Sequence, residues 1–361
     1  MKTKKIFILS AAVIIFTLLS GCSAAAMGSD SWPGLSADAE TAYIANGGLV
    51  YAINLKNGGV NWQYPADKAD AKEAYFADPV LTEDEQLILA SAGPDHSLIS
   101  VNPASGHLNW SFGDAEGVWV GSPLVIGETI YAPNADGKIY ALDIKGSFLW
   151  AKHISDNALW AQPVSDGEYL YITSLDHHVY AFDIARKEIA WEIGLNGAIP
   201  GQATLDENGV LYVGALDSTI TAIDSQSQKI LWSTSLNGWV WDSAVVEDNI
   251  LYVGDLEGYV YALDTEDGSL LWTPAQPNGP ITGSPLVTEN LIIIGTEGGS
   301  AYAFDKDGGS IWQQNINGKL YTNPVLGGEL ILFTPMENES DIVLVALDLD
   351  GRQVWSFTPE K

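Results

Sequence analysis

Asp176, His177 and His178 are the residues whose types best suit a metal ion, because imidazole and carboxylate groups ligate transition metals. Adjacent residues of a strand point to opposite faces, so only one of the two histidines can join Asp176 on a given face. The equivalent position of a neighbouring repeat is Asp136-Gly137, a pair typical of a turn. A turn is therefore favoured, and no metal site is predicted.

Aromatic and polar side chains recur just before the expected innermost strand of most repeats. They are Phe76, Asp78, Trp119, Trp160, Gln162, Gln202, Trp241, Asp242, Tyr321 and Asn323. Aromatic rings with a few convergent polar groups are typical of ligand and partner sites. These residues either form a binding face at the mouth of a central channel or plug that channel, and the plug is favoured over a specific small-molecule site.

Catalytic motifs do not stand out from the turn residues. The sequence offers no Ser/His/Asp elbow, no phosphate-cradling glycine loop and no paired-carboxylate motif. Gly298-Gly299 and Gly308-Gly309 are more typical of hairpin turns than of phosphate sites. The sequence therefore predicts a protein that is not an enzyme.

The elements that position these residues repeat along the chain, and each repeat ends in tryptophan. The eight are Trp62, Trp110, Trp150, Trp191, Trp232, Trp272, Trp312 and Trp355. Successive spacings of 48, 40, 41, 41, 40, 40 and 43 residues give a period near forty, which indicates a propeller or solenoid. We expect these indoles to lock each repeat to the next.

Each repeat is expected to supply four strands; in the sixth they are 243–246, 250–254, 259–264 and 270–272. The innermost strands are expected to begin near Pro33, Pro79, Pro123, Pro163, Ala203, Ala244, Pro285 and Pro324. The sequence predicts an all-β protein, an eight-bladed β-propeller of four-stranded antiparallel blades over residues 32–361. The last repeat carries its own outer strand at 353–355, so side-chain packing is expected to close the ring. A short helix is expected over 66–74.

The motif of Ala262, Asp264, Gly268 and Trp272 resembles the tryptophan-docking motif of the PQQ-like, quinoprotein-type propeller family. That family includes PQQ-dependent dehydrogenases and the BamB-like outer-membrane assembly lipoproteins. The resemblance covers residues 31–358, although two copies carry Lys187 and Gln228 where glycine is expected. It implies a scaffold in outer-membrane protein assembly, with a Leu- and Arg-containing loop contacting the barrel-assembly protein. The corresponding linkers 195–198 and 236–239 contain no Arg.

PQQ is the cofactor that the enzymes of this family use. It carries three carboxylates, and after residue 31 the chain has only two arginines, Arg186 and Arg352, both expected in turns on the opposite face. The enzymes also place a vicinal disulfide beside the quinone, which a chain with one cysteine cannot form. No loop shows the oxygen spacing of a dedicated Ca²⁺ site either. We expect neither cofactor.

The N-terminal residues are interpreted as a targeting segment. Lys2, Lys4 and Lys5 precede an apolar run over 6–19, and Leu19-Ser20-Gly21-Cys22 matches a bacterial lipobox. We therefore expect a lipoprotein signal peptide at 1–21, lipidation of Cys22 and a flexible tether over 22–31. An ordinary signal peptide with an incidental cysteine is the alternative.

The formal charge of −30 disfavours nucleic acid and anionic lipid as partners, so membrane contact is expected through the lipid alone. The leading interpretation is a lipid-anchored cell-envelope scaffold that binds a protein, with the barrel-assembly machinery as a candidate partner. The alternative is a small-ligand binder or degenerate quinoprotein that uses the aromatic channel mouth. Localisation is expected on the periplasmic side of the outer membrane, or on the outer face of the cytoplasmic membrane if the source has one membrane.

Overall fold

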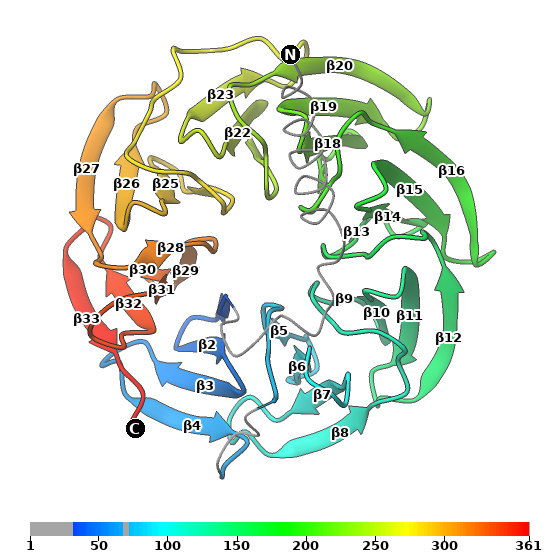
Figure 1. The fold of residues 1–361 in the computed structure, drawn as a ribbon, viewed down its shortest axis with the longest axis vertical. Helices are drawn as coiled ribbons and strands as arrows, with labels where there is room; N and C mark the ends of the chain where they lie inside the picture. The colour runs from blue at the N-terminus through cyan, green and yellow to red at the C-terminus, as the bar shows by residue number, and fades with distance from the viewer. Residues whose placement is uncertain (1–31, 68–71, 361) are drawn as a thin grey trace, which may run out of the picture.

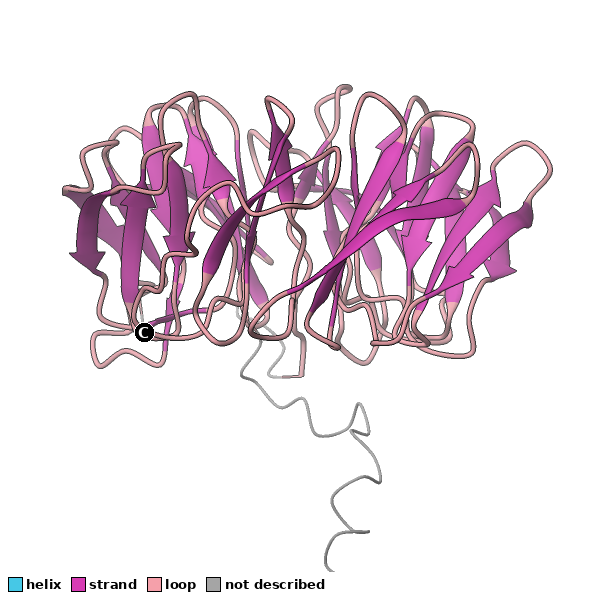
Figure 2. Cartoon of the chain, turned by 90° about the horizontal axis from the view of Figure 1, so that it is seen from above, coloured by secondary structure: helices cyan, strands magenta, loops and turns pink. Residues whose placement is uncertain are grey.

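The strands of this protein form eight antiparallel blades around a central axis, as the computed structural model of residues 32–67 and 72–360 shows (Figure 1). Within a blade the chain runs from the axis outward, each strand pairing with its predecessor. Figure 2 shows the ring from its edge, with loops on both faces. The predicted all-β, eight-bladed propeller is confirmed.

The strands fall into blades in sequence order. Blades 1 to 4 hold β1 (Gly34–Ala37), β2 (Thr41–Asn46), β3 (Leu49–Asn54), β4 (Val60–Tyr64); β5 (Val80–Leu81), β6 (Leu87–Ala90), β7 (Leu98–Val101), β8 (Leu108–Phe112); β9 (Leu124–Ile126), β10 (Thr129–Pro133), β11 (Lys138–Asp143), β12 (Phe148–His153); β13 (Val164–Ser165), β14 (Tyr169–Thr173), β15 (His178–Asp183) and β16 (Glu188–Gly194). Blades 5 to 8 hold β17 (Thr204–Leu205), β18 (Val210–Ala215), β19 (Thr219–Asp224), β20 (Lys229–Ser235); β21 (Val245–Glu247), β22 (Ile250–Gly254), β23 (Val260–Asp264); β24 (Leu286–Val287), β25 (Ile292–Gly295), β26 (Ser300–Phe304), β27 (Ser310–Asn315); β29 (Val325–Gly327), β30 (Leu330–Phe333), β32 (Leu344–Leu347) and β33 (Gln353–Phe357). Each innermost strand begins directly after the predicted Pro or Ala.

Blade 6 differs from the others in its outer segment. Residues 270–275 pair with β23 through two isolated bridges, Leu263 with Leu270 and Val260 with Ala275, instead of a regular strand. Reciprocal backbone hydrogen bonds between Val260 and Ala275, of 2.8 and 3.1 Å, still cover the edge of β23. The outer strand expected at 270–272 is therefore present as an irregular segment.

The hydrophobic core lies between neighbouring blades, because both faces of each middle strand are apolar. In β11 the run Ile139-Tyr140-Ala141-Leu142 is buried on both sides. Ile139 and Ala141 pack with Leu170 and Phe182 of blade 4, whereas Tyr140 packs with blade 2 residues. Adjacent strand residues point to opposite faces, so one strand stabilises two blade interfaces.

Side-chain packing closes the ring, as the sequence predicts. Trp355 of β33 donates its indole N–H to the Leu55 carbonyl of blade 1 at 2.8 Å, and a single cluster of buried residues combines strands of blades 1 and 8. Leu35 of β1 and Leu332 of β30 both belong to that cluster. The first and last blades thus meet through the same kind of contact that joins several other neighbouring pairs, such as Trp232 of blade 5 with Thr265 of blade 6.

The expected helix over 66–74 is not seen in the described part of that segment, and residues 68–71 lie outside the described residues. Instead Tyr75 bridges to Ser91, and Glu73 accepts a hydrogen bond from the Ser91 hydroxyl. The longer loop of blade 8 contains β31 (Pro335–Met336), which pairs with β28 (Lys319–Leu320). Over residues 32–67 and 72–360 no helix has the length and apolarity to cross a membrane.

Candidate functional site

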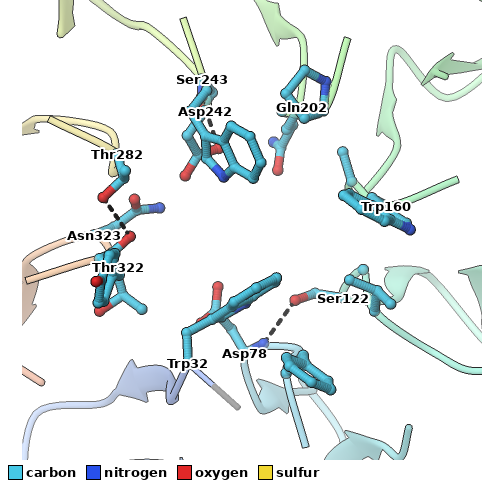
Figure 3. A pocket seen from close by; sticks show the side chains of 18 of the residues that line it. Trp32, Asp78, Ser122, Trp160, Gln202, Asp242, Ser243, Thr282, Thr322 and Asn323 are labelled. Carbon is cyan, nitrogen blue, oxygen red and sulfur yellow. Dashed lines mark hydrogen bonds between the residues drawn. The ribbon is translucent and has the colours of Figure 1, made fainter. Parts of the chain in front are cut away.

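A cavity of about 440 Å³ lies on the axis, where the linkers that precede the innermost strands converge (Figure 3). Leu256 and Glu297, from the second-to-third loops of blades 6 and 7, also line it. Outer-to-inner linkers and second-to-third loops share one face, here called the cavity face. Nine of the ten predicted residues line this cavity: Phe76, Asp78, Trp160, Gln162, Gln202, Trp241, Asp242, Tyr321 and Asn323.

Asp78 and Asp242 face the cavity from opposite sides, because they precede blades 2 and 6 of an eight-bladed ring (Figure 3). The Asp78 carboxylate is accessible to the cavity but surrounded by protein, and this burial raises its pKa to about 6. The charge of Asp242 adds to the rise, while the Leu35 N–H, 2.8 Å from Oδ1 of Asp78, opposes it. Burial also raises the pKa of Asp242. An ionised pair here is therefore costly without a cation.

Hydrogen bonds around the axis fix the linkers to one another. The Asp78 N–H donates to the Ser122 hydroxyl at 3.0 Å, and Nε2 of Gln162 donates to the Pro123 carbonyl at 2.7 Å. Across the ring, the Ser284 N–H donates to Oδ1 of Asn323 at 2.6 Å. Each bond joins adjacent blades, so part of the predicted polar set holds the ring together rather than pointing freely into the cavity.

Aromatic side chains form much of the cavity wall, and one of them escaped the sequence analysis. Trp32 lines the cavity and packs edge-on against Phe76, with ring centroids 4.9 Å apart. It directly precedes Pro33, the position that Asp78 holds before Pro79, so aligning the repeats on these prolines would have found it. The same alignment finds Ser122, which also lines the cavity.

Trp119 does not belong to the cavity face, and its placement corrects the prediction. The side chain is fully buried, donates its indole N–H to the His96 carbonyl at 2.6 Å and packs edge-on against Tyr140. Trp119 lies four residues before Pro123, whereas Trp160 lies three before Pro163. Val120, three residues before Pro123, holds the position that aligns with Trp160 and lines the cavity instead.

The repeated tryptophans lie at the blade interfaces. In six of the eight, a glycine in the third-to-fourth turn of the next blade approaches the indole so closely that an added Cβ would lie 2.4–3.0 Å from the ring. These tryptophans are Trp62, Trp110, Trp232, Trp272, Trp312 and Trp355. Over Trp150 the next blade places Lys187, whose Nζ lies 5.8 Å from the ring centroid. Trp191 instead lines a hollow that it shares with Gln228.

The predicted turn at Asp176, His177 and His178 is what the structure shows. His177 has a positive φ of 75°, and Asp176 accepts hydrogen bonds of 2.6 Å each from the hydroxyls of Ser155 and Tyr180. Residues 32–67 and 72–360 contain no group of three His, Cys, Asp or Glu side chains placed to hold a metal. Asp176 therefore stabilises its turn and the neighbouring strand.

Trp239 is the most exposed tryptophan on the cavity face, with 53% of its surface accessible. Its loop is rigid: the Asn237 N–H donates to the Tyr261 hydroxyl at 2.9 Å, and the Gly238 N–H donates to Asp255 at 2.8 Å. The Leu256 N–H donates to the Trp239 carbonyl at 2.9 Å. The backbone that carries this exposed apolar ring is thus held by hydrogen bonds to neighbouring residues. In the sequence, this linker is distinguished only by its lack of Arg.

Comparison with known proteins gives one family and several similar folds. The family model described as outer membrane protein assembly factor BamB matches residues 23–234, 175–284 and 276–361. No curated protein matches the sequence.

Two solved structures illustrate the fold. BamB from Moraxella catarrhalis superposes with a TM-score of 0.70 at 18% identity, covering 90% of this chain and 96% of that one. The computationally designed Ika8 protein superposes with a TM-score of 0.72 at 16% identity, covering 92% and 98%. At these identities the superpositions show a shared fold, and the family match extends over nearly the whole propeller. The chain therefore belongs to the family of the outer membrane protein assembly factor BamB.

Proposed function

We propose that this protein is a non-catalytic, lipid-anchored scaffold of the cell envelope that binds a protein partner during outer-membrane protein assembly. The observation that carries partner binding is the exposed Trp239 on its rigid loop. Exposed tryptophans that need no reordering are frequent energetic centres of protein interfaces. The family description supports the assembly role, and the lipobox sequence ending at Cys22, outside the described residues, supports the anchor.

A PQQ enzyme is disfavoured by the charge of the cavity. Its lining includes the carboxylates of Asp78, Asp242 and Glu297 and no Lys, Arg or His. PQQ carries three carboxylates of its own, which such a lining repels. Calorimetric titration with PQQ and Ca²⁺ tests this; saturable binding would favour the degenerate quinoprotein over the scaffold.

Affinity capture from solubilised envelopes tests the scaffold. The purified protein should retain an envelope protein, and Trp239→Ala should lose it by roughly 30-fold or more in affinity, as expected for an interfacial anchor worth about 2 kcal/mol. Phe148→Ala is the matched control, because Phe148 is 52% exposed but lies on the outer strand β12. Equal capture by wild-type protein and Trp239→Ala would exclude this loop as the docking site.

The identity of the captured protein tests the assembly role, and mass spectrometry of the eluate provides it. A subunit of the barrel-assembly machinery would support the proposal, whereas a partner without any role in outer-membrane assembly would contradict it.

For the anchor, Cys22→Ser should move the protein from the membrane fraction to the soluble fraction on cell fractionation.

A further inference from the structure

We infer that the axial cavity binds an alkylammonium ion, held between the carboxylates of Asp78 and Asp242 and against aromatic walls. This inference goes beyond the scaffold function, because it concerns a ligand site at the axis that needs no partner on the rim.

The charge of the cavity selects a cation. Three carboxylates line it, and none of its lining residues is Lys, Arg or His. The ammonium group of Lys319, 5.7 Å from the ring centroid of the lining residue Tyr321, is already paired with Glu337 at 2.7 Å. Two ionised carboxylates enclosed together repel each other and have lost much of their hydration. A bound cation would compensate both effects.

The hydrogen-bonding capacity of the Asp78 carboxylate selects an ammonium that carries N–H groups. Among the described residues, one donor is bonded to the Asp78 carboxylate, the Leu35 N–H on Oδ1. A carboxylate has about four acceptor sites, so Oδ2 of Asp78 can accept from a ligand. A quaternary ammonium has no N–H to donate, whereas a primary ammonium has three donors.

The size and walls of the cavity select an organic cation rather than a bare metal ion. A volume of about 440 Å³ falls in the range of small-molecule sites, and the described residues hold no metal-type cluster of three ligands. Half-exposed indoles of Trp160 and Trp241 line it together with Trp32. Aromatic faces attract cations and also pack against an alkyl chain.

The opposed positions of the carboxylates fit a ligand that is charged at both ends or that reaches in from outside. A free diamine and a lysine side chain of another polypeptide present the same alkylammonium group. The titratable groups that face the cavity are Asp78, Asp242, Glu297 and Tyr321. Since the pKa of Asp78 is about 6, the site holds its full negative charge only above that pH.

Isothermal titration of the purified protein with 1,4-diaminobutane at low ionic strength and pH 7.5 tests the site. Saturable one-to-one binding is expected, with none for the neutral 1,4-butanediol. Asp78→Asn and Asp242→Asn should each weaken binding roughly 10-fold or more, the usual loss for one charge-assisted contact. Lowering the pH to 5 should weaken wild-type binding as well.

Glu207→Gln is the control, because Glu207 lies in an acidic hollow between blades 4 and 5, away from the cavity. It removes the same charge and should leave the affinity unchanged. Circular dichroism identifies a variant that fails to fold. If one aspartate variant does not fold, the other one still tests the inference. No saturable binding by the wild-type protein, or equal binding by the aspartate variants, would overturn the inference.

A second titration with Nα-acetyl-lysine N-methylamide distinguishes the two sources. Tighter binding of the lysine derivative would assign the site to a polypeptide, and tighter binding of the diamine to a free amine. All these measurements use the purified protein without a partner. Their failure is therefore separate from failure of the envelope capture.

Discussion

Single residues decide what the axis of this propeller can do, because equivalent positions hold different side chains in successive blades. The residue before the proline that precedes the innermost strand is Trp32 in blade 1, Asp78 in blade 2, Gln162 in blade 4 and Asn323 in blade 8. An eightfold framework thus presents a cavity without eightfold symmetry. Specificity on such a ring comes from these substitutions, not from the fold.

Asp78→Asn should stabilise the protein at neutral pH. The pKa of Asp78 rises from 3.8 to about 6 on folding, so the folded state binds that proton more tightly than the unfolded chain. Ionisation between these values therefore lowers the free energy of unfolding. In thermal melts, the melting temperature of the variant should exceed that of the wild type at pH 7.5 and equal it near pH 4.

Asp143→Asn should instead have a lower melting temperature than the wild type at pH 7.5, because the Ser147 N–H lowers the pKa of Asp143.

Trp119→Ala should cost about 3–5 kcal/mol of stability, the range for truncating a fully buried aromatic residue. Urea denaturation measures the loss. Trp241→Ala, at a half-exposed cavity residue, should cost much less. Folded Trp119→Ala should capture the envelope partner as well as the wild type does. Reduced capture would show that Trp119 belongs to the binding face after all.

At the scale of the element, the third-to-fourth turn is the device that joins blades. Its first residue caps the turn: Oδ1 of Asp264 accepts the Glu266 N–H at 2.7 Å, and Oδ1 of Asp143 accepts the Ser147 N–H at 2.8 Å. Its glycine has positive φ and lies flat against the indole of the preceding blade. Turn and tryptophan therefore act as one unit.

Gly146→Ala should disrupt that unit. Gly146 has φ of 82°, and a Cβ would lie 2.4 Å from the Trp110 ring. Left-handed strain and overpacking together predict a loss of about 2–4 kcal/mol in urea denaturation. Gln228→Gly is the matched comparison, because Gln228 holds φ of 57° at the equivalent turn. It should leave stability unchanged or raise it by up to about 1 kcal/mol. Equal losses in both variants would contradict the proposed role of the glycine.

For the whole molecule, the seam between blades 8 and 1 resembles the internal interfaces. The Trp355 N–H reaches a carbonyl 300 residues away in sequence, with the geometry that Trp232 uses toward Thr265 of the next blade. Among residues 32–67 and 72–360, no strand passes from one end of the chain into the other terminal blade, because β1 to β4 complete one sheet and β29, β30, β32 and β33 complete another. In this part of the chain, side-chain packing and the Trp355 hydrogen bond close the ring.

Trp355→Ala and Trp232→Ala should therefore destabilise the protein by similar amounts, about 2–4 kcal/mol for these partly buried indoles. Urea denaturation followed by intrinsic fluorescence and by far-ultraviolet circular dichroism measures both. The two probes should give one coincident transition for each variant. A separate early transition in Trp355→Ala would show that the seam is weaker than the internal interfaces.

The sequence by itself determined the number of blades, the place of each innermost strand and the use of side chains for closure. Tryptophans near forty residues apart and prolines before the inner strands suffice for this, because each repeat must bury its apolar faces against its neighbours. Nine of the ten predicted cavity residues follow from the same register. Trp119 was misplaced by a single position, because it lies four residues before its proline, whereas Trp160 lies three residues before Pro163.

Only the tertiary structure decided which side chains share the axis and which charges meet there. Asp78 and Asp242 lie 164 residues apart in sequence and face each other because blades 2 and 6 stand opposite in a closed ring. The position of the Trp239 loop likewise depends on hydrogen bonds that the Asn237 and Gly238 N–H groups donate to Tyr261 and Asp255. Local patterns fix strands and turns, whereas burial and charge in the cavity arise from contacts among all eight blades.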